Sequence, residues 1–333
     1  MIKKLISTGM TVILLVMMTA CGQTSDASGR TDVVTLKMNS VKTSSDPEYQ
    51  WWESFLKEIE EKSNGTLKCE IYPSESIGTQ ANMIEATSRG AAILQDCDAS
   101  WLSNYVADFS VFMAPYTIQK PEEIQQLWES EIGQDMCERL EEHGLKVVTI
   151  VYFGTRNLIS NRPVETREDM KNLKIRCAST KMWNEVVRVL GGNATNTPWS
   201  ETYQAISQGI ADGAESPYSL LYSSKLYEQA KYITKTEHVV ASTVIVMSKE
   251  LFDSLPKEAQ DAIEEVGHSY PDQAIENVQG VEQEYIDKLT AEGVMISEID
   301  KTAFLEAAKD TKKQFPEWTE GLYEEVHKVL GHE

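Results

Sequence analysis

Hydrophobic and polar positions follow two spacings along this chain: alternation with a period of two, typical of strands, and a period near 3.6, typical of helices. Val34 to Met38 ("VTLKM") alternates and predicts a strand. Tyr49 to Glu61 places Trp52, Phe55 and Ile59 on one face, which predicts an amphipathic helix. The folded part of the chain therefore begins with a strand and a helix.

The same succession continues through the rest of the chain. Further strands are predicted at residues 66–72, 93–97, 146–153, 173–177 and 238–248, and further helices at 83–89, 181–190, 201–208 and 220–228. This order implies an α/β protein with a parallel sheet covered by helices. From Pro256 towards Gly293 we predict a long helix, which Pro271 should kink or split in two. At 333 residues, two α/β lobes with a ligand cleft between them are expected.

The first 20 residues have the layout of an export signal. Two lysines precede an apolar stretch from Val12 to Met18, which is too short for a stable membrane span, and small residues precede Cys21. The sequence "MTAC" resembles the bacterial lipobox, in which the cysteine is diacylated and becomes the new N-terminus. Residues 21–31 would then form a polar tether. The alternative is an ordinary cleaved signal followed by a chance cysteine.

The chain is strongly acidic, with a formal net charge of −21. Loss of Lys3 and Lys4 with the signal would remove two positive charges and give −23. Such a field argues against nucleic acid or anionic lipid as a partner. An anionic ligand would need positive charge concentrated at its binding site. Arg156 and Arg176, each inside a short apolar-patterned run, are the candidates.

Four cysteines remain apart from Cys21: Cys69, Cys97, Cys137 and Cys177. They allow three disulfide pairings, but a chain of this length buries a core without disulfides, so free or buried thiols are favoured. They lack the close spacing of a metal site. The sequence also contains no nucleophile elbow, His-Glu-x-x-His motif, phosphate-binding loop or dinucleotide fingerprint. We therefore expect no enzyme activity, cofactor or metal.

Long stretches of the chain resemble the solute receptors of tripartite ATP-independent periplasmic (TRAP) transporters, the family named for C4-dicarboxylate binding. The most specific part, Arg156 to Thr234, has a Lys-Ile-Arg strand after Gly-Thr-Arg, then Pro-Trp-Ser-Glu-x-Tyr and Gly-x-x-Asp-Gly-x-Glu-x-Pro. The resemblance covers nearly all of the chain after the tether. It implies a two-lobed fold of the periplasmic-binding-protein type (class II), with crossover strands and a long helix lying along both lobes.

The same resemblance implies a division into lobes and a function. Residues 32–153 and 242–281 would form lobe I, and residues 154–241 and 282–333 lobe II, with crossovers near Phe153 and Ala241. The receptor would capture an organic acid outside the membrane and deliver it to a permease driven by an ion gradient. We expect it to act as a monomer, held at the membrane by its lipid.

In the resembled family, the arginine of the Lys-Ile-Arg strand makes a bidentate pair with the ligand carboxylate, and Arg176 occupies that position. A planar guanidinium offers two parallel donors and stays charged, whereas lysine lacks the fork. Strand alternation alone would instead turn Arg176 towards solvent. Arg156 matches a second family arginine, which assists at or behind the carboxylate. Without the resemblance, a surface turn position beside Gly154 is equally consistent with the sequence.

This chain departs from the family at two places. Relatives have Gln-Glu-Asn-Pro where this chain has "AESP", so Glu215 is kept but Ser216 replaces the amide that helps hold the carboxylate. A hydroxyl donates only one hydrogen bond, so recognition would depend more on the arginines or on water. Asp96 and Asp98 stand where relatives carry mostly small or apolar residues, and Asp98 is the better cleft candidate. It could accept hydrogen bonds from ligand hydroxyls or an ammonium, or it could neutralise an arginine. The alternative is that it caps a helix or lies in solvent.

Five other residues complete the candidate ligand site. Trp199 could stack on the ligand, or it could belong to the core. Asn39, Gln80, His238 and Tyr218 occupy positions that line the cleft in relatives. Two other functions remain: the substrate-binding lipoprotein of an ATP-driven importer, and an exported hydrolase whose nucleophile the sequence does not display. Neighbouring genes for membrane subunits or for an ATPase would separate the two transport hypotheses. The ligand is not determined, although a hydroxylated acid such as a sugar acid is favoured over a dicarboxylate.

Overall fold

The structure is a computed structural model that describes residues 33–332. The predicted export signal, the predicted lipidation site Cys21 and the predicted tether lie outside the described residues. Between residues 33 and 332, no helix is both long enough and apolar enough to cross a membrane.

The described chain forms one nine-stranded sheet in the order β2-β1-β3-β8-β4-β7-β5-β6, with β9 pairing with β8. The strands are β1 (Val34–Asn39), β2 (Leu67–Tyr72), β3 (Ile93–Cys97), β4 (Leu145–Ser160), β5 (Lys174–Cys177), β6 (Asn193–Asn196), β7 (Gly213–Ser216), β8 (Tyr232–Ser248) and β9 (Met295–Ser297). We call β2, β1 and β3 the first half-sheet and β7, β5 and β6 the second half-sheet. Within each, the pairings are parallel, as predicted.

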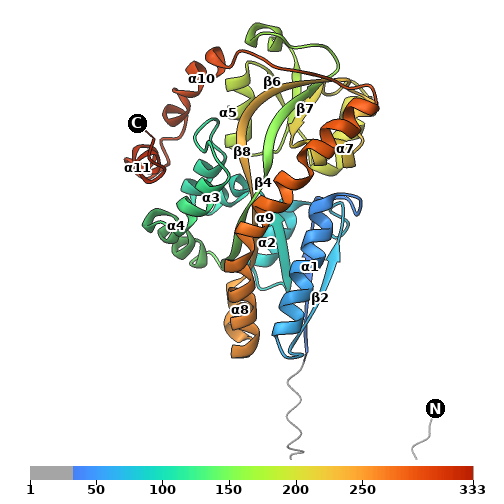
Figure 1. The fold of residues 1–333 in the computed structure, drawn as a ribbon. Coiled ribbons are helices and arrows are strands. Elements are labelled where there is room, and N and C mark those ends of the chain that lie inside the picture. Colours follow the sequence, from blue (N-terminus) through green and yellow to red (C-terminus); the bar gives the residue numbers. More distant parts are fainter. Residues whose placement is uncertain (1–32, 333) are drawn as a thin grey trace, which may run out of the picture. The chain divides into compact units, whose positions relative to one another are not determined.

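The centre of the sheet is antiparallel, which the parallel sheet expected from the strand–helix order did not include. The long strands β4 and β8 pair with each other in opposite directions (Figure 1). β8 also pairs with β3, and β4 also pairs with β7, so the two long strands join the half-sheets. Gly154 pairs with Ala241 where the register shifts. The predicted crossover positions therefore lie opposite each other.

Eleven α-helices are present in the described chain. They are α1 (Pro47–Lys62), α2 (Gln80–Ser88), α3 (Glu122–Glu129), α4 (Glu131–Glu141), α5 (Lys181–Leu190), α6 (Thr202–Ser207), α7 (Tyr218–Ser223), α8 (Lys249–Ser254), α9 (Lys257–Ala291), α10 (Thr302–Ala308) and α11 (Leu322–Val329). Six 3-10 turns accompany them: η1 (Ala99–Asn104), η2 (Ala107–Met113), η3 (Arg167–Met170), η4 (Trp199–Glu201), η5 (Leu226–Glu228) and η6 (Thr311–Gln314). The predicted helix at 220–228 is thus divided between α7 and η5.

The long helix α9 runs alongside β4 and contacts α1 and α7 (Figure 1). It continues through Pro271, so it is not split. Proline removes one backbone hydrogen bond, but buried Val266, Tyr270 and Ala274 anchor the helix on both sides of it. Gly267 lets the helix approach the strand closely, because a Cβ atom there would lie 2.2 Å from the carbonyl oxygen of Val148. Packing therefore overrides the local effect of the proline.

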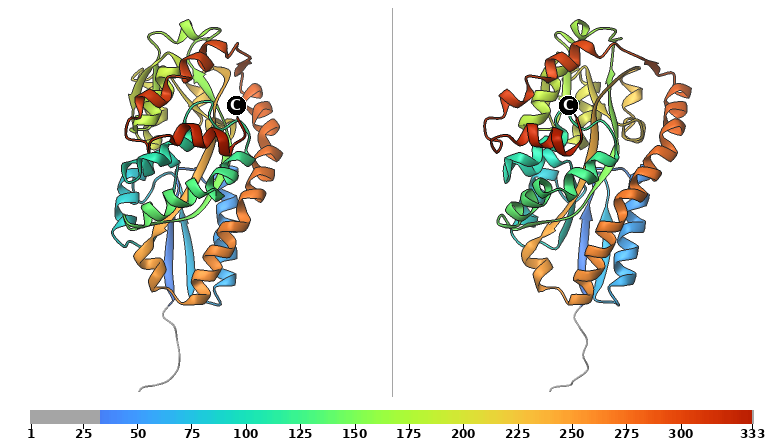
Figure 2. Two further views of the ribbon diagram at one scale, coloured as in Figure 1. Left: turned by 90° about the vertical axis from the view of Figure 1, so that its left-hand side faces the viewer. Right: turned by 60° about the vertical axis from the view of Figure 1, so that its left-hand side comes forward.

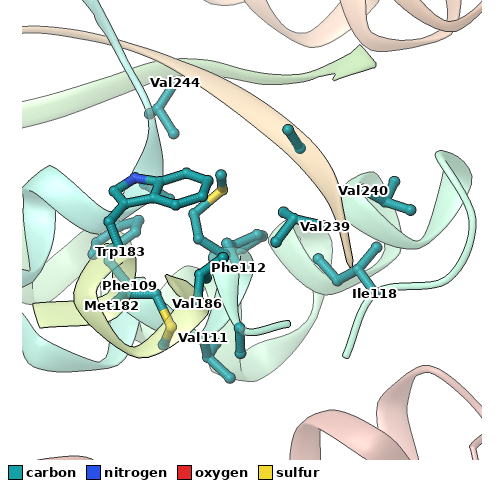
Figure 3. Packing of buried hydrophobic residues seen from close by; sticks show 14 of the residues in the cluster. Phe109, Val111, Phe112, Ile118, Met182, Trp183, Val186, Val239, Val240 and Val244 are labelled. Atoms are coloured by element: carbon teal, nitrogen blue, oxygen red, sulfur yellow. The ribbon is translucent and has the colours of Figure 1, made fainter. Parts of the chain in front are cut away.

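The core extends from one half-sheet to the other. In Figure 3, Met182 and Trp183 of α5 pack together with Phe109 and Phe112 of η2. The C-terminal segment joins the same core: it passes from α10 beside α5 to α11 beside α3 (Figure 2). Trp318 Nε1 donates a hydrogen bond of 2.8 Å to Ser110 Oγ. Elements far apart in sequence thus fix the walls of the site described below.

The bend at Gly154 gives a stability prediction. Its φ is +129°, and a Cβ atom would lie 2.7 Å from Cβ of Pro217. Gly154→Ala should lower the free energy of unfolding by about 1–3 kcal/mol, measured by urea denaturation. Gly280→Ala, inside α9 with no atom within 4 Å of the new methyl group, should raise it by about 0.5–1 kcal/mol. Equal effects of the two substitutions would contradict a special constraint at Gly154.

Candidate ligand site

A cavity of about 50 Å³ lies where the two half-sheets meet, at the carboxyl ends of the parallel strands. Its first wall comes from β3, α2 and the loop after β1, and its second wall from β5, α5 and η4. The floor comes from β4, β7, α7 and β8. The lining residues are Val41, Lys42, Gln80, Asp96, Cys97 and Asp98 on the first wall, Arg176, Ala178, Trp183 and Trp199 on the second, and Phe153, Arg156, Glu215, Leu220, Ser242 and Thr243 on the floor.

Six of the ten predicted ligand-binding residues line this cavity: Arg156, Arg176, Asp98, Glu215, Trp199 and Gln80. The other four are placed behind or beside it. Asn39 donates hydrogen bonds to Gly78 O and Gln95 Oε1, and Ser216 is fully buried without a hydrogen-bond partner for Oγ among the described residues. Tyr218 faces a smaller cavity next to α9. His238 lies behind Glu215.

Arg156 is neutralised inside the protein. Its Nε lies 2.5 Å from Glu215 Oε2, and its Nη2 lies 2.9 Å from Glu215 Oε1. The same Nη2 donates to the carbonyl oxygen of Glu215 at 2.9 Å. The guanidinium also stacks over the ring of Trp183 at 4.4 Å. Arg156 thus donates three hydrogen bonds to Glu215. This bidentate arrangement holds Arg156 rigidly at the floor.

His238 supports the same carboxylate. Its Nε2 lies 3.1 Å from Glu215 Oε2, and its Nδ1 lies 2.8 Å from Thr236 Oγ1. Burial lowers the pKa of His238 below its ordinary value, against the attraction of Glu215. Burial alone would raise the pKa of Glu215, but Arg156 and His238 hold that pKa below its usual value. The arrangement is consistent with a neutral imidazole donating from Nε2 to an ionised Glu215.

Arg176 has no such counter-charge. The residue is only 4% exposed, and its Nε and Nη2 both donate to the carbonyl oxygen of Thr197, at 3.1 and 2.6 Å. The guanidinium lies 5.0 Å from the ring of Trp199. In the part of the chain that the structure describes, no carboxylate forms an ion pair with it. Burial lowers the pKa of Arg176 to about 10, so the side chain stays charged at neutral pH.

Asp98 connects the two walls. It caps η1, since Oδ1 accepts hydrogen bonds from Ser100 N, at 2.9 Å, and from Ser100 Oγ. Its Oδ2 accepts from Nε1 of Trp183 on the opposite wall, at 3.1 Å. The capping alternative from the sequence is therefore correct, yet the side chain also lines the cavity and is partly exposed.

Three more hydrogen bonds join residues that belong to opposite predicted lobes. Thr180 Oγ1 donates to Ser100 Oγ at 3.0 Å. Ser200 N donates to Glu75 Oε2 at 3.1 Å. Ser223 Oγ donates to Asp46 Oδ2 at 2.8 Å, and Asp46 in turn caps α1. Together with Asp98 and Trp183, these contacts hold the walls together.

Sequence analysis missed Lys42, a lysine that is only 2% exposed yet lines the cavity. Its Nζ lies 3.0 Å from Glu48 Oε2, 3.9 Å from Asp96 Oδ2 and 3.8 Å from the centre of the Phe153 ring. A lysine soon after a strand end, with Asp46 and Glu48 close in sequence, was the available signal. Asp96 joins it only through the fold.

The buried cluster around Lys42 contains three acidic side chains, those of Asp46, Glu48 and Asp96, and one basic side chain. Burial alone would lower the pKa of Lys42, but the three surrounding carboxylates raise it above its ordinary value. Burial raises the pKa of Glu48 to about 8; Lys42 opposes the shift, while Asp96 and Asp46 add to it. Burial also raises the pKa of Asp46 and of Asp96. Lys42 is thus charged but fully offset by its neighbours.

Other chemistry is not apparent in the described region. Residues 33–332 contain no group of three or more His, Cys, Asp or Glu side chains arranged to hold a metal ion. Cys69, Cys97, Cys137 and Cys177 are all free thiols. Burial raises the pKa of the cavity-lining Cys97 well above its ordinary value, so that thiol is unreactive.

Comparison with protein families gives a match over residues 38–317 to the DctP family, described as bacterial extracellular solute-binding protein, family 7. A curated relative, a solute-binding protein of Chromohalobacter salexigens, is 30% identical over 79% of each chain.

Two solved structures are similar to this fold. One is a TRAP periplasmic solute-binding protein from Actinobacillus succinogenes with bound L-galactonate, with a TM-score of 0.87 and 27% identity, covering 90% of this chain and 99% of that one. The other is a TRAP periplasmic solute-binding protein from Fusobacterium nucleatum with bound sn-glycerol-3-phosphate, with a TM-score of 0.86 and 28% identity, covering 89% and 97%.

The Lys42 cluster gives a pH prediction. The folded protein keeps the Glu48 proton up to about pH 8, whereas an unfolded glutamate releases it near pH 4.5, so this group lowers stability as pH rises between these values. Glu48→Gln removes that effect. Relative to wild type, its free energy of unfolding should rise by about 1–3 kcal/mol across this window in urea titrations. Glu53→Gln, on the exposed face of α1, is the control and should show no trend. A wild-type advantage that grows with pH would contradict the assignment.

Proposed function

The chain belongs to family 7 of the bacterial extracellular solute-binding proteins, TRAP receptors for small organic acids, and from that premise we propose that Arg176 binds the acid's carboxylate. The second arginine, Arg156, lines the floor of the same cavity. Because Glu215 neutralises Arg156, the charge of the ligand would be balanced by Arg176, with Arg156 assisting.

One observation carries this proposal: Arg176 is a buried cation that forms no ion pair with a carboxylate of residues 33–332. A buried charge is costly unless it is paired, so a ligand anion supplies what the fold omits. Glu215 already neutralises Arg156, which makes Arg156 the assisting group and Arg176 the primary one. In a cavity screened from water the pairing is also stronger than at the surface.

The favoured ligand is a hydroxylated acid, such as a sugar acid; a C4-dicarboxylate is the other candidate. L-galactonate and sn-glycerol-3-phosphate, the ligands of the two similar structures, both combine an anionic group with hydroxyl groups. Gln80 and Asp98 on the first wall offer acceptors for such hydroxyls, and Trp199 offers an apolar face. Ser216 lies outside the lining, so carboxylate recognition depends on the arginines.

Binding would involve closure of two lobes, 32–153 with 242–281 and 154–241 with 282–333. A ligand that touches both walls binds the closed form more tightly and so shifts the equilibrium towards it. The hydrogen bonds between Asp98 and Trp183 and between Ser200 and Glu75 would form in the same step.

The setting is outside the cytoplasm, as for the family. We propose that the protein is a monomer, tethered to the membrane through lipid on Cys21, and that it hands its ligand to the membrane subunits of an ion-gradient-driven permease. Mass spectrometry of the mature N-terminus would test the lipid directly.

A thermal-shift panel of organic acids tests the function. A ligand at about a hundred times its dissociation constant should stabilise the fold by about 2.7 kcal/mol, which is visible as a rise in melting temperature. Hydroxylated acids should give the largest shifts. A panel of sugar acids, dicarboxylates, aromatic acids and oxo acids in which no compound shifts the transition would contradict the proposal.

Substitution of Arg176 tests the carboxylate contact. Arg176→Ala should raise the dissociation constant of the acid by about thirtyfold or more, because a charge-assisted pair is lost. Arg176→Lys should recover only part of this, since lysine lacks the fork. The melting temperature without ligand should change little, because the described residues offer the Arg176 side chain only one hydrogen-bond acceptor, the carbonyl oxygen of Thr197. Calorimetric titration measures both dissociation constants.

Arg89→Ala is the matched control, since Arg89 caps the C-terminal end of α2 with its side chain 75% exposed. It should leave the affinity unchanged. If the Arg176 variants bound the acid as tightly as this control, Arg176 would not be the carboxylate site.

A further inference from the structure

We propose that this cavity accepts ligands with negative charge at one end only, and that Asp98 requires a hydrogen-bond donor at the other end. The inference rests on the proposed function, and it decides between the two ligand classes left open there. It favours a hydroxylated monocarboxylate over a dicarboxylate.

The lining carries equal numbers of charged groups of each sign: the cations Lys42, Arg156 and Arg176, and the carboxylates Asp96, Asp98 and Glu215. Their positions are not equivalent. The first wall carries one cation and two carboxylates, whereas the second wall and the floor together carry two cations and one carboxylate. The net charge therefore differs across the cavity: it is negative on the first wall and positive on the second wall and floor.

Internal pairing removes four of these six charges from contact with a ligand. Arg156 and Glu215 neutralise each other. Asp96 is fully buried, accepts from Ser40 Oγ at 2.6 Å and from Val41 N at 3.3 Å, and shares Lys42 with Glu48. Arg176 on the second wall and Asp98 on the first wall remain.

Asp98 has one acceptor position to spare. Both hydrogen bonds from Ser100 fall on Oδ1, while among the described residues Oδ2 accepts only from Trp183 Nε1. A carboxylate oxygen has two lone pairs, so Oδ2 retains one. Because Asp98 is the lining carboxylate that is partly exposed, a ligand hydroxyl or ammonium can reach it.

A second anionic group would meet repulsion instead. Two like charges a few ångströms apart repel each other at the effective dielectric constant of a protein surface. Lys42 is the cation on this wall, but Asp46, Glu48 and Asp96 surround it. The negative charge that Arg176 attracts on the second wall is thus disfavoured on the first wall.

Matched pairs of acids test this selectivity. In each pair a terminal CH₂OH group is replaced by a carboxylate: L-threonate and tartrate, D-gluconate and D-glucarate, 4-hydroxybutyrate and succinate. Calorimetric titration of the purified protein should show the dicarboxylate binding at least about tenfold more weakly in every pair that binds. The alditol D-glucitol, without a carboxylate, should not bind.

Asp98→Asn tests the residue. The amide keeps an oxygen for the cap on Ser100 but removes the charge, so the preference against the dicarboxylate should fall about tenfold. Asp261→Asn, an exposed position on α9 that pairs with Lys257, makes the same chemical change and should leave the preference intact. Even if Asp98→Asn fails to fold, the matched acid pairs still test the charge selectivity on the wild-type protein.

The outcomes separate the two proposals. A dicarboxylate that binds as tightly as its hydroxy partner, or more tightly, overturns the charge selectivity while leaving the acid receptor in place. An unchanged preference in Asp98→Asn overturns the role of Asp98. If no acid of any pair binds and the wider acid panel is also silent, the proposed function fails and the selectivity fails with it.

Discussion

A buried guanidinium without a counter-charge is the constraint on which the site depends. Arg176 stands at the end of β5, next to Trp199, and within residues 33–332 its side chain bonds only to the carbonyl oxygen of Thr197. In water such a charge would be solvated, and in a closed core it would be paired. Here it faces a cavity between two walls, so the favourable partner is an anion from outside. Because the exterior of the protein is acidic, an anionic ligand is attracted only inside the cavity, and this makes binding there more selective.

The two arginines divide this task because the fold treats them differently. Glu215 holds Arg156 in place, and His238 holds Glu215 in place. The three side chains are buried, and their hydrogen bonds are satisfied without a ligand. They give the floor of the cavity a fixed shape. Arg176 lies on β5, one strand beyond β7 in the same sheet, and its charge remains available to a ligand. A rigid, neutralised floor next to an unneutralised wall would let one cavity combine stable folding with the proposed affinity for an anion.

The sequence predicted the strand–helix order and the end of β5 well, because short apolar runs and a specific Lys-Ile-Arg motif mark them. It ended β4 too early and began β8 too late, since β4 continues through the buried polar residues Arg156 and Asn157, and β8 begins before the buried polar residues Thr234 and Thr236. β7, "GAES", has no apolar pattern at all. Lys42 was missed because its partner Asp96 is near only in the fold, and the antiparallel centre is a property of strand pairing that no local pattern encodes.

The most direct test of the account is a crystal structure of the protein with the acid that stabilises it most. The account predicts a ligand carboxylate with both oxygens about 3 Å from guanidinium nitrogens of Arg176, between the two walls. A carboxylate bound elsewhere, with Arg176 still bonded only to the carbonyl oxygen of Thr197, would contradict it.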